Sequence, residues 1–174
     1  MINPIPERTI NYRVYDDFGA LLGVATVDLP DIEAMSDTIS GAGIAGEVET
    51  PTLGHFGSMT ATINWRTITP DAMRLAAQRM HALELRSAQQ VTDAGAGEVL
   101  SQAVRVVLRG TPKNTSLGSL EVGAATDSST ELEVSYLKIY IANYPVLEID
   151  KFNFVYVVDG VDYLAQVRRD LGMR

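Results

Sequence analysis

Residues 131–174 read ELEVSYLKIYIANYPVLEIDKFNFVYVVDGVDYLAQVRRDLGMR, and this stretch carries the clearest strand and helix patterns of the chain. Polar and apolar residues alternate over 131–136, and both faces then become apolar, which predicts a strand that enters a covered region. A second run rich in β-branched and aromatic residues follows over 146–158 and predicts another strand. Because only a short connection separates the two strands, we expect an antiparallel pair.

A short helix is expected after the second strand. The Asp-Gly pair at 159–160 breaks the strand pattern, and Asp162 is suited to cap a helix N-terminus. Gly172 is predicted to end this helix. Apolar residues recur at helical spacing between them, at Leu164, Val167 and Leu171.

The N-terminal half predicts further strands. Residues 9–15 and 20–29 flank an Asp-Asp-Phe-Gly turn, so we expect an opening hairpin. Residues 32–40 are ambiguous between a strand and a short helical turn. Residues 58–67 alternate cleanly and predict a half-exposed strand. Its apolar face comprises Met59, Ala61, Ile63 and Trp65.

A longer helix is predicted over residues 69–87. Thr69 can cap it, Pro70 suits the first helical position, and Asp71 favours the positive end of the helix dipole. One side of this helix is expected to pack against a sheet. That side comprises Met73, Ala76, Ala77, Met80 and Leu83.

These elements, with one more strand expected over 102–109, add up to about seven strands and two helices. Strands that follow one another directly in the chain favour antiparallel pairing. We therefore predict a mainly antiparallel α+β fold, a sandwich or an open barrel with one packed helix and a short C-terminal helix. A length of 174 residues fits one domain over 1–174.

The most irregular segment is 41–57, GAGIAGEVETPTLGHFG, which holds five glycines and a proline. Such a composition predicts a long Gly-rich loop or an extended flexible hairpin. Residues 41–46 match the G-x-G-x-x-G dinucleotide fingerprint. The fingerprint also requires a preceding buried strand and a following helix, and neither is predicted, so we favour a flexible loop.

Composition excludes several classes of function. A net charge of -8 argues against a protein that grips nucleic-acid backbone. With no cysteine, disulfides and thiolate metal sites are excluded. The sequence shows no apolar run of membrane-spanning length and no secretion signal, which predicts a cytosolic product that does not engage a membrane.

No catalytic, metal or cofactor site is expected. The two histidines, His55 and His81, lack a second ligand at metal spacing. We expect His55 to be exposed in the Gly-rich segment and His81 to lie at the surface or boundary of the long helix. The serines lack a nucleophile signature, so we expect a protein that is not an enzyme.

The order of an LKIYI strand, a VLEID strand, Asp-Gly-Val-Asp and a closing LAQVRRDLG helix resembles the C-terminal part of the major tail tube proteins of contractile-tailed bacteriophages, the FII type. The resemblance extends to NYRVYDDFGALLGVATVDLP, to GAGIAGEVETPTLG and to VRVVLRG. Residues 88–101 carry no part of it.

The resemblance implies a structural protein of the virion tail, assembled in the bacterial host cytoplasm. Homohexameric rings stack into the inner tube, which encloses the tape measure protein, carries the sheath and conducts DNA. Baseplate or initiator proteins are the further partners that it implies. Strand edges joined between subunits would satisfy backbone groups that a monomer leaves open.

Family members use a long early loop to contact the next ring, and residues 41–57 occupy the corresponding place. The hypothesis is that this segment is mobile in the free subunit and ordered on stacking, with Ile44, Val48 and Leu53 giving apolar contacts. The candidate contact residues are Gly41, Gly43, Ile44, Gly46, Val48, Pro51 and Leu53.

Glu131, Glu133 and Ser135 share one polar strand face. This face is either the solvated side of a sheet or the wall of a channel, where the two acids would repel DNA phosphates. Alternation alone does not say which face points inward.

Two other functions remain open at this stage. One is the inner tube of a headless contractile device, such as a bacteriocin or a secretion system. The other is a monomeric β-rich module that binds a ligand or a protein, which would show a pocket lined by convergent polar groups.

Overall fold

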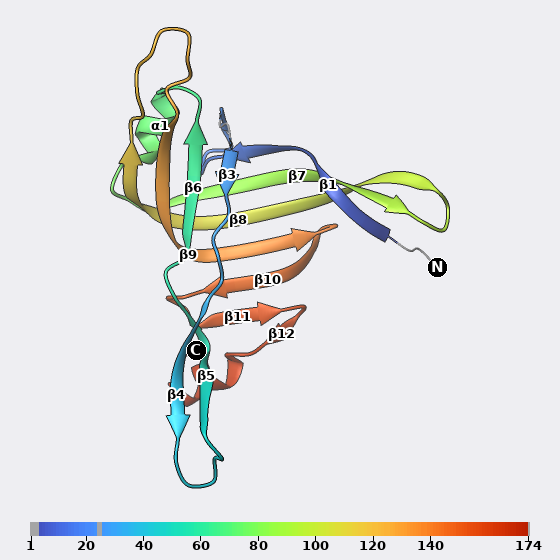
Figure 1. Ribbon diagram of the computed structural model, residues 1–174, viewed down its shortest axis with the longest axis vertical. Coiled ribbons are helices and arrows are strands. Elements are labelled where there is room, and N and C mark those ends of the chain that lie inside the picture. Colours follow the sequence, from blue (N-terminus) through green and yellow to red (C-terminus); the bar gives the residue numbers. More distant parts are fainter. Residues whose placement is uncertain (1–3, 24–25, 174) are drawn as a thin grey trace.

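The computed structural model in Figure 1 describes residues 4–23 and 26–173. Within these residues the chain forms twelve strands and two short helices. The N-terminal half contains β1 (Pro4–Tyr15), β2 (Leu21–Leu22), β3 (Thr26–Asp28), β4 (Ala34–Ser40), β5 (Glu47–Phe56), β6 (Thr60–Trp65) and α1 (Pro70–Leu75). The C-terminal half contains β7 (His81–Asp93), β8 (Glu98–Ser116), β9 (Ser128–Ile141), β10 (Tyr144–Asp150), β11 (Val155–Val158), β12 (Val161–Asp162) and α2 (Ala165–Asp170).

Ten of the strands form one antiparallel sheet. Its main path runs β12-β11-β10-β9-β8-β7-β1-β2, while β6 pairs with β9 and β3 pairs with β6. The two remaining strands, β4 and β5, pair only with each other in the described chain. The large sheet is open rather than closed. The expected mainly antiparallel fold with two helices is therefore confirmed, although the strands are more numerous than predicted, and β1, β8 and β9 are longer.

A β-bulge at Ser135 divides the large sheet into two parts. Tyr136 lies opposite Arg109 while Val134 lies opposite Gly110, so Ser135 is an extra residue on β9. On one side of the bulge the Val134 amide donates to Met59 O at 2.7 Å, next to β6. On the other side Ser135 O accepts from the Lys151 amide at 3.0 Å, where β10 ends. β9 thus exchanges one neighbouring strand for another at this residue.

Figure 1 shows the two resulting parts crossing at a steep angle. We call β3, β6, residues 128–134 of β9 and residues 110–116 of β8 the upright part. We call β1, β7, residues 98–109 of β8, residues 135–141 of β9, and β10 the lateral part. Their inner faces meet in a core whose most buried large side chains include Trp65, Met59, Ile63, Leu83, Leu108 and Leu132.

The apolar face predicted for residues 58–67 is confirmed. Met59, Ala61 and Ile63 are fully buried and Trp65 is nearly so. The Trp65 indole N–H donates to Thr130 Oγ1 at 3.2 Å, which satisfies the only polar atom that this side chain brings into the core.

The helix predicted over 69–87 is wrong beyond its first two turns. Thr69 caps it as expected, but α1 ends at Leu75, and Ala72 and Leu75 are its buried residues. β7 follows, because His81, Leu83 and Leu85 are buried and alternate with the less buried Ala82 and Glu84. The packing face proposed from Met73 and Met80 is also wrong, since both are exposed.

His81 is buried rather than a surface or boundary residue. Its side chain is only 3% exposed, and its Nε2 lies 3.0 Å from Ala77 O in the turn that precedes β7. A local backbone carbonyl therefore lies within hydrogen-bond distance of one ring nitrogen, as expected for a buried polar side chain.

The strand predicted over 146–158 is interrupted by a turn at 151–154. Asp150 Oδ1 accepts from the amides of Phe152 and Asn153 at 3.1 and 3.0 Å, and this side-chain acceptor replaces ladder pairing.

Two further predictions are wrong. Asp162 belongs to β12 and is not the N-cap of the C-terminal helix, which is Leu164. Likewise 20–29 is not one strand, because β2 pairs with β1 and β3 pairs with β6.

Candidate assembly surfaces

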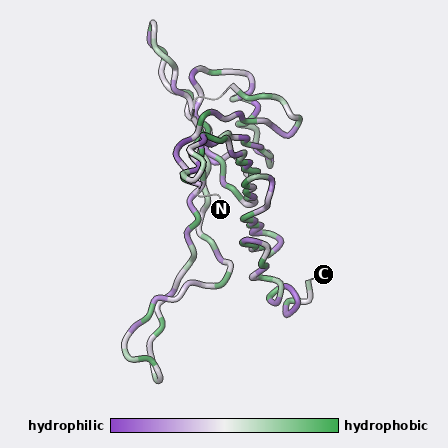
Figure 2. Tube along the Cα trace, turned by 90° about the vertical axis from the view of Figure 1, so that its right-hand side faces the viewer, coloured by the Kyte–Doolittle hydropathy of each residue, from purple (hydrophilic) through white to green (hydrophobic). Residues whose placement is uncertain are grey.

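The segment 34–56 forms a protruding hairpin, which we call the arm. β4 and β5 pair with Ile39 opposite Val48 and Ser40 opposite Glu47, and residues 41–46 connect them. Of the two structures predicted for the glycine-rich segment, the extended hairpin is correct. A loop spanning all of 41–57 is wrong, because β5 occupies 47–56. Figures 1 and 2 show the arm projecting away from the large sheet.

Every residue of β4 is exposed, so the arm has almost no packing of its own. An isolated two-stranded hairpin is at best marginally stable in water, which makes the arm a segment that gains from a partner. No helix follows the glycines at 41–46, so the dinucleotide fingerprint lacks the helix N-terminus that it requires.

The arm carries two different faces. Val48 and Ile39 form an exposed apolar pair on one face, while Glu47 and Glu49 lie on the other. The predicted contact residues Gly41, Gly43, Ile44 and Gly46 lie in the turn, whereas Val48, Pro51 and Leu53 lie on β5. The structure therefore does not gather them on one face.

The base of the arm is held against the C-terminal elements. Gly54 has a φ of +67°, and a Cβ built on it would lie 2.5 Å from Cδ1 of the buried Leu164. Phe56 contacts Tyr156 edge to face with ring centroids 5.0 Å apart. The Lys151 ammonium donates to Gly57 O at 2.6 Å. The arm is thus free at its tip and fixed at its base.

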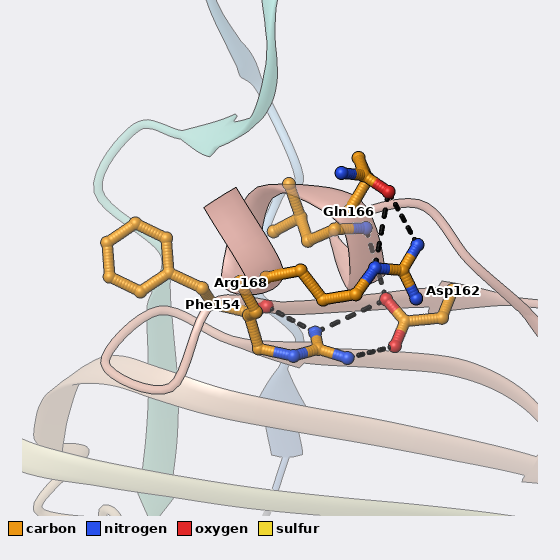
Figure 3. Close-up of polar contacts among 6 residues, drawn as sticks. Phe154, Asp162, Gln166 and Arg168 are labelled. Atoms are coloured by element: carbon orange, nitrogen blue, oxygen red, sulfur yellow. Dashed lines mark hydrogen bonds and ion pairs between the residues drawn. The ribbon is translucent and has the colours of Figure 1, made fainter. Parts of the chain in front are cut away.

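α2, whose N-cap is Leu164, is clamped by Arg168 (Figure 3). The Arg168 guanidinium donates to Phe154 O at 2.7 Å and forms an ion pair with Asp162. The hydrogen bond from Arg168 is the main reason that the pKa of Asp162 lies below its usual range. Asp162 also accepts from the Leu164 amide at 3.1 Å, so one carboxylate joins β12 to the start of α2.

Glu131 and Glu133 lie on the outer, polar face of the upright part. Glu133 lies opposite Thr60 of β6 and Thr111 of β8. It accepts from Ser58 Oγ at 2.6 Å and lies 3.9 Å from the Lys151 ammonium. Hydroxyl side chains dominate the surroundings of both acids, so this face is hydrophilic and weakly acidic.

The outer face of the lateral part has the opposite character. Arg13, Arg86 and Arg105 occupy directly opposed positions on β1, β7 and β8, and Tyr140 on β9 continues the row. We call this surface the Arg–Tyr face. It comprises Arg13, Arg86, Arg105, Arg109, Lys138, Tyr15, Tyr136 and Tyr140.

Aromatic rings and two glutamates position the cations of the Arg–Tyr face. The guanidinium of Arg105 lies 3.9 Å from the Tyr140 ring centroid, and that of Arg109 lies 4.8 Å from the Tyr136 ring. Two glutamates on the same face are acceptors: Glu84 for Arg86 at 2.7 Å, and Glu148 for Lys138 at 2.9 Å and the Tyr136 hydroxyl at 2.9 Å.

These contacts raise the pKa values of three residues of the Arg–Tyr face. Burial, with a smaller effect from the hydrogen bond to Glu148, raises the pKa of Tyr136 to about 12. The hydrogen bond to Glu148 also raises the pKa of Lys138, and the hydrogen bond to Glu84 raises the pKa of Arg86. The cations and the neutral phenol therefore persist well above neutral pH.

The upright part has two edges, and at each of them the described strand pairs with another strand on one side only. β3 pairs with β6 alone, and β8 beyond Gly110 pairs with β9 alone. Pro112 lies on this stretch of β8, where a missing N–H is tolerated. Unpaired edges are templates for pairing with another chain.

A family model for the phage tail tube protein FII matches residues 6–172, which is nearly the whole chain. The chain belongs to the FII family of phage tail tube proteins. The tail tube protein of Escherichia phage P2 is 30% identical over 174 residues, covering 97% of this chain and 99% of that protein. The resemblance drawn from the C-terminal quarter is thereby confirmed.

Two solved structures align with this tail tube protein, and the first shows that its fold recurs. A chain of the PVC sheath/tube terminator of an extracellular contractile injection system, in the extended state, aligns with a TM-score of 0.53 and 14% identity. The alignment covers 78% of this chain and 97% of that one. A chain of the PVC sheath-tube complex aligns with a TM-score of 0.48 and 15% identity, over 74% and 87% of the two chains.

Family membership confirms that this tail tube protein is a structural component of the virion and not an enzyme. Among the described residues, no group of three or more acidic, histidine or cysteine side chains is placed to hold a metal ion. The described helices are also too short and too polar to cross a bilayer.

Proposed function

We propose that this protein assembles into homohexameric rings that stack into the inner tube of a contractile phage tail and conduct DNA. The observation that carries the proposal is the pair of open edges on the upright part, in a chain of the tail tube family. β3 of one subunit pairs with residues 111–116 of β8 in the next, so the upright parts join into a continuous barrel. Both edges then lose their unpaired backbone groups.

In this assembly the outer face of the upright part lines the bore. Glu131, Glu133 and the neighbouring hydroxyls provide a wetted, weakly negative wall that does not retain DNA phosphates. The tape measure protein occupies the bore before DNA passes, the sheath surrounds the tube, and baseplate or initiator proteins start its growth. Assembly takes place in the host cytoplasm.

The arm is the element that connects successive rings. Its tip is exposed in the isolated subunit, and its base is fixed by Gly54 and Phe56 against α2 and β11. Contacts from Ile44, Val48 and Leu53 with the next ring order the arm and cover its exposed apolar side chains. One experiment tests the arm and the rings together.

The decisive experiment compares the full-length protein with an arm-shortened variant. Residues 38–49 are replaced by Asn-Gly, because Asp37 and Thr50 are paired opposite each other and such a turn closes a hairpin. Negative-stain electron microscopy and light scattering at rising concentration, with and without baseplate complexes as seeds, should show rings and tubes for the full-length protein. The variant should keep its circular dichroism spectrum and form no tubes.

Tubes of normal length from the variant would contradict the role of the arm. A full-length protein that stays monomeric at every concentration, even with seeds, would overturn the ring proposal and favour the monomeric binding module. For the headless alternative, the likeness to an injection-system chain is the observation in its favour. Neighbouring genes for a capsid and a terminase would decide for a phage.

A further inference from the structure

The net charge of the protein is unevenly distributed along the chain. Between Arg13 and Arg66 the sequence has no lysine or arginine, yet it contains eight acidic residues, while the rest of the chain is balanced. Five of these acids lie on the arm or on the segment that leads into it. They are Asp31, Glu33, Asp37, Glu47 and Glu49.

The acids of the arm are accessible. Glu47 and Glu49 are exposed on one face of β5, separated by about 7 Å along the strand. Asp37 is exposed on β4. The cations nearest in sequence are outside the arm, so the tip carries its negative charge uncompensated.

The Arg–Tyr face carries an excess of positive charge, opposite in sign to the charge of the arm. Arg13, Arg86 and Arg105 are directly opposed on three neighbouring strands, and like charges in this arrangement repel. Glu84 is shared between two of them, with its Oε1 at 2.7 Å from Arg86 and 3.8 Å from Arg105. Additional carboxylates would relieve this repulsion.

The face is also organised before any partner arrives. Arg105 and Arg109 are held over tyrosine rings, so their guanidinium groups lose less freedom when a carboxylate binds. The Arg86 and Arg105 side chains remain 61% and 41% exposed, which leaves their N–H groups open to a bidentate acceptor.

We propose that the acidic face of the arm of one copy docks on the Arg–Tyr face of the next copy. This inference rests on the proposed function, because it assumes that the arm connects rings. The arm projects away from the lateral part in both views, so its tip meets this face only on another molecule (Figures 1 and 2). Such a head-to-tail contact does not close on itself and continues along a stack.

Reciprocal charge reversal tests the contact. Glu47→Lys/Glu49→Lys and Arg86→Glu/Arg105→Glu should each raise the concentration needed for tube formation at least tenfold, measured by sedimentation and electron microscopy. The four substitutions combined should restore assembly to within about threefold of the original protein. Arg74→Glu/Arg169→Glu changes the net charge equally at exposed sites on α1 and α2 and should assemble normally.

Each outcome bears on the proposal. Circular dichroism separates loss of fold from loss of docking, and Arg86→Gln/Arg105→Gln gives a milder variant that should also assemble poorly. Normal tubes from Arg86→Glu/Arg105→Glu would overturn the contact.

If Arg86→Glu/Arg105→Glu forms normal tubes but the arm-shortened variant does not, the stacking role of the arm stands and the arm docks on another surface. The apolar groove of about 270 Å³ lined by Tyr12, Val27 and Leu29 would be the next surface to test.

Two further results would also count against docking between copies. A quadruple variant that folds but assembles no better than either pair would show that the two charge sets do not meet. The original protein could instead retain short duplex DNA at physiological salt. If Arg86→Glu/Arg105→Glu lost this binding but still formed normal tubes, the Arg–Tyr face would be a nucleic-acid contact.

Discussion

At the scale of single residues, Tyr136 couples the Arg–Tyr face to pH. Its pKa of about 12 exceeds the ordinary value of 10, so the folded state holds this proton where the unfolded state has lost it. The free energy of unfolding should therefore be fully retained below pH 10 and fall as pH rises from about 10 to 12. Lys138, whose pKa is also raised, contributes in the same direction.

Tyr136→Phe tests this directly. The variant should show a shallower loss of stability over that pH range in urea titrations, and an ultraviolet absorbance titration should lose its most alkaline tyrosine. Tyr144→Phe serves as a matched control, because it removes a phenol from a half-exposed residue outside the Arg–Tyr face. Equal slopes for all three proteins would contradict the assignment.

Individual faces were predictable where alternation is local. The buried set on β6 and the shared face of Glu131 and Glu133 both follow from a period of two within one strand. The Arg–Tyr face was missed, because its residues come from β1, β7, β8 and β9 and meet only through their register. The alternation of Arg105, Val107 and Arg109 was a visible signal, but a single strand does not reveal its neighbours.

At the scale of elements, the bend between β8 and β9 depends on Gly110. A Cβ on this residue would lie 2.7 Å from Glu133 O, a backbone atom that cannot rotate away. Gly110→Ala should therefore lower the free energy of unfolding by about 1–3 kcal/mol and displace the bulge at Ser135.

Urea denaturation measures the loss, and Gly57→Ala is the control. The nearest atom to a Cβ on Gly57 is Glu33 O at 3.8 Å, which is an ordinary contact. A Gly110→Ala protein as stable as Gly57→Ala would mean that the two strands separate at this point without cost.

Element boundaries were harder to predict than element types. Thr69, Pro70 and Asp71 did begin a helix, but start signals say nothing about length. Small residues at 76–77 extended the helical pattern, whereas burial of His81, Leu83 and Leu85 in the sheet favoured β7. Tertiary burial thus outweighed local propensity. The same reason explains β8, which continues to Ser116 because β9 pairs with it through residues 111–116.

At the scale of the whole molecule, assembly should change the protection of the arm. In the isolated subunit the β4 and β5 amides lie in a two-stranded hairpin with exposed side chains, so they should exchange with solvent much faster than those of β7 and β8. In tubes their exchange should slow by at least tenfold, because stacking covers the arm. Hydrogen-exchange mass spectrometry of subunits and tubes checks this.

The same experiment compares the protection of an open edge of the upright part with that of a turn. Residues 111–116 of β8 should also gain protection in rings, whereas residues 151–154, which lie in a turn, should not. Arm exchange that is equally fast in subunits and tubes would show that stacking leaves the hairpin uncovered.

The absence of lysine and arginine between Arg13 and Arg66 has a consequence for proteolysis of the free subunit. Exposed hairpins are preferred sites of proteolytic attack. An enzyme of trypsin specificity, which cuts after basic side chains, nevertheless has no bond to cleave anywhere in the arm. The free subunit is therefore resistant to proteases of this specificity at its most accessible segment.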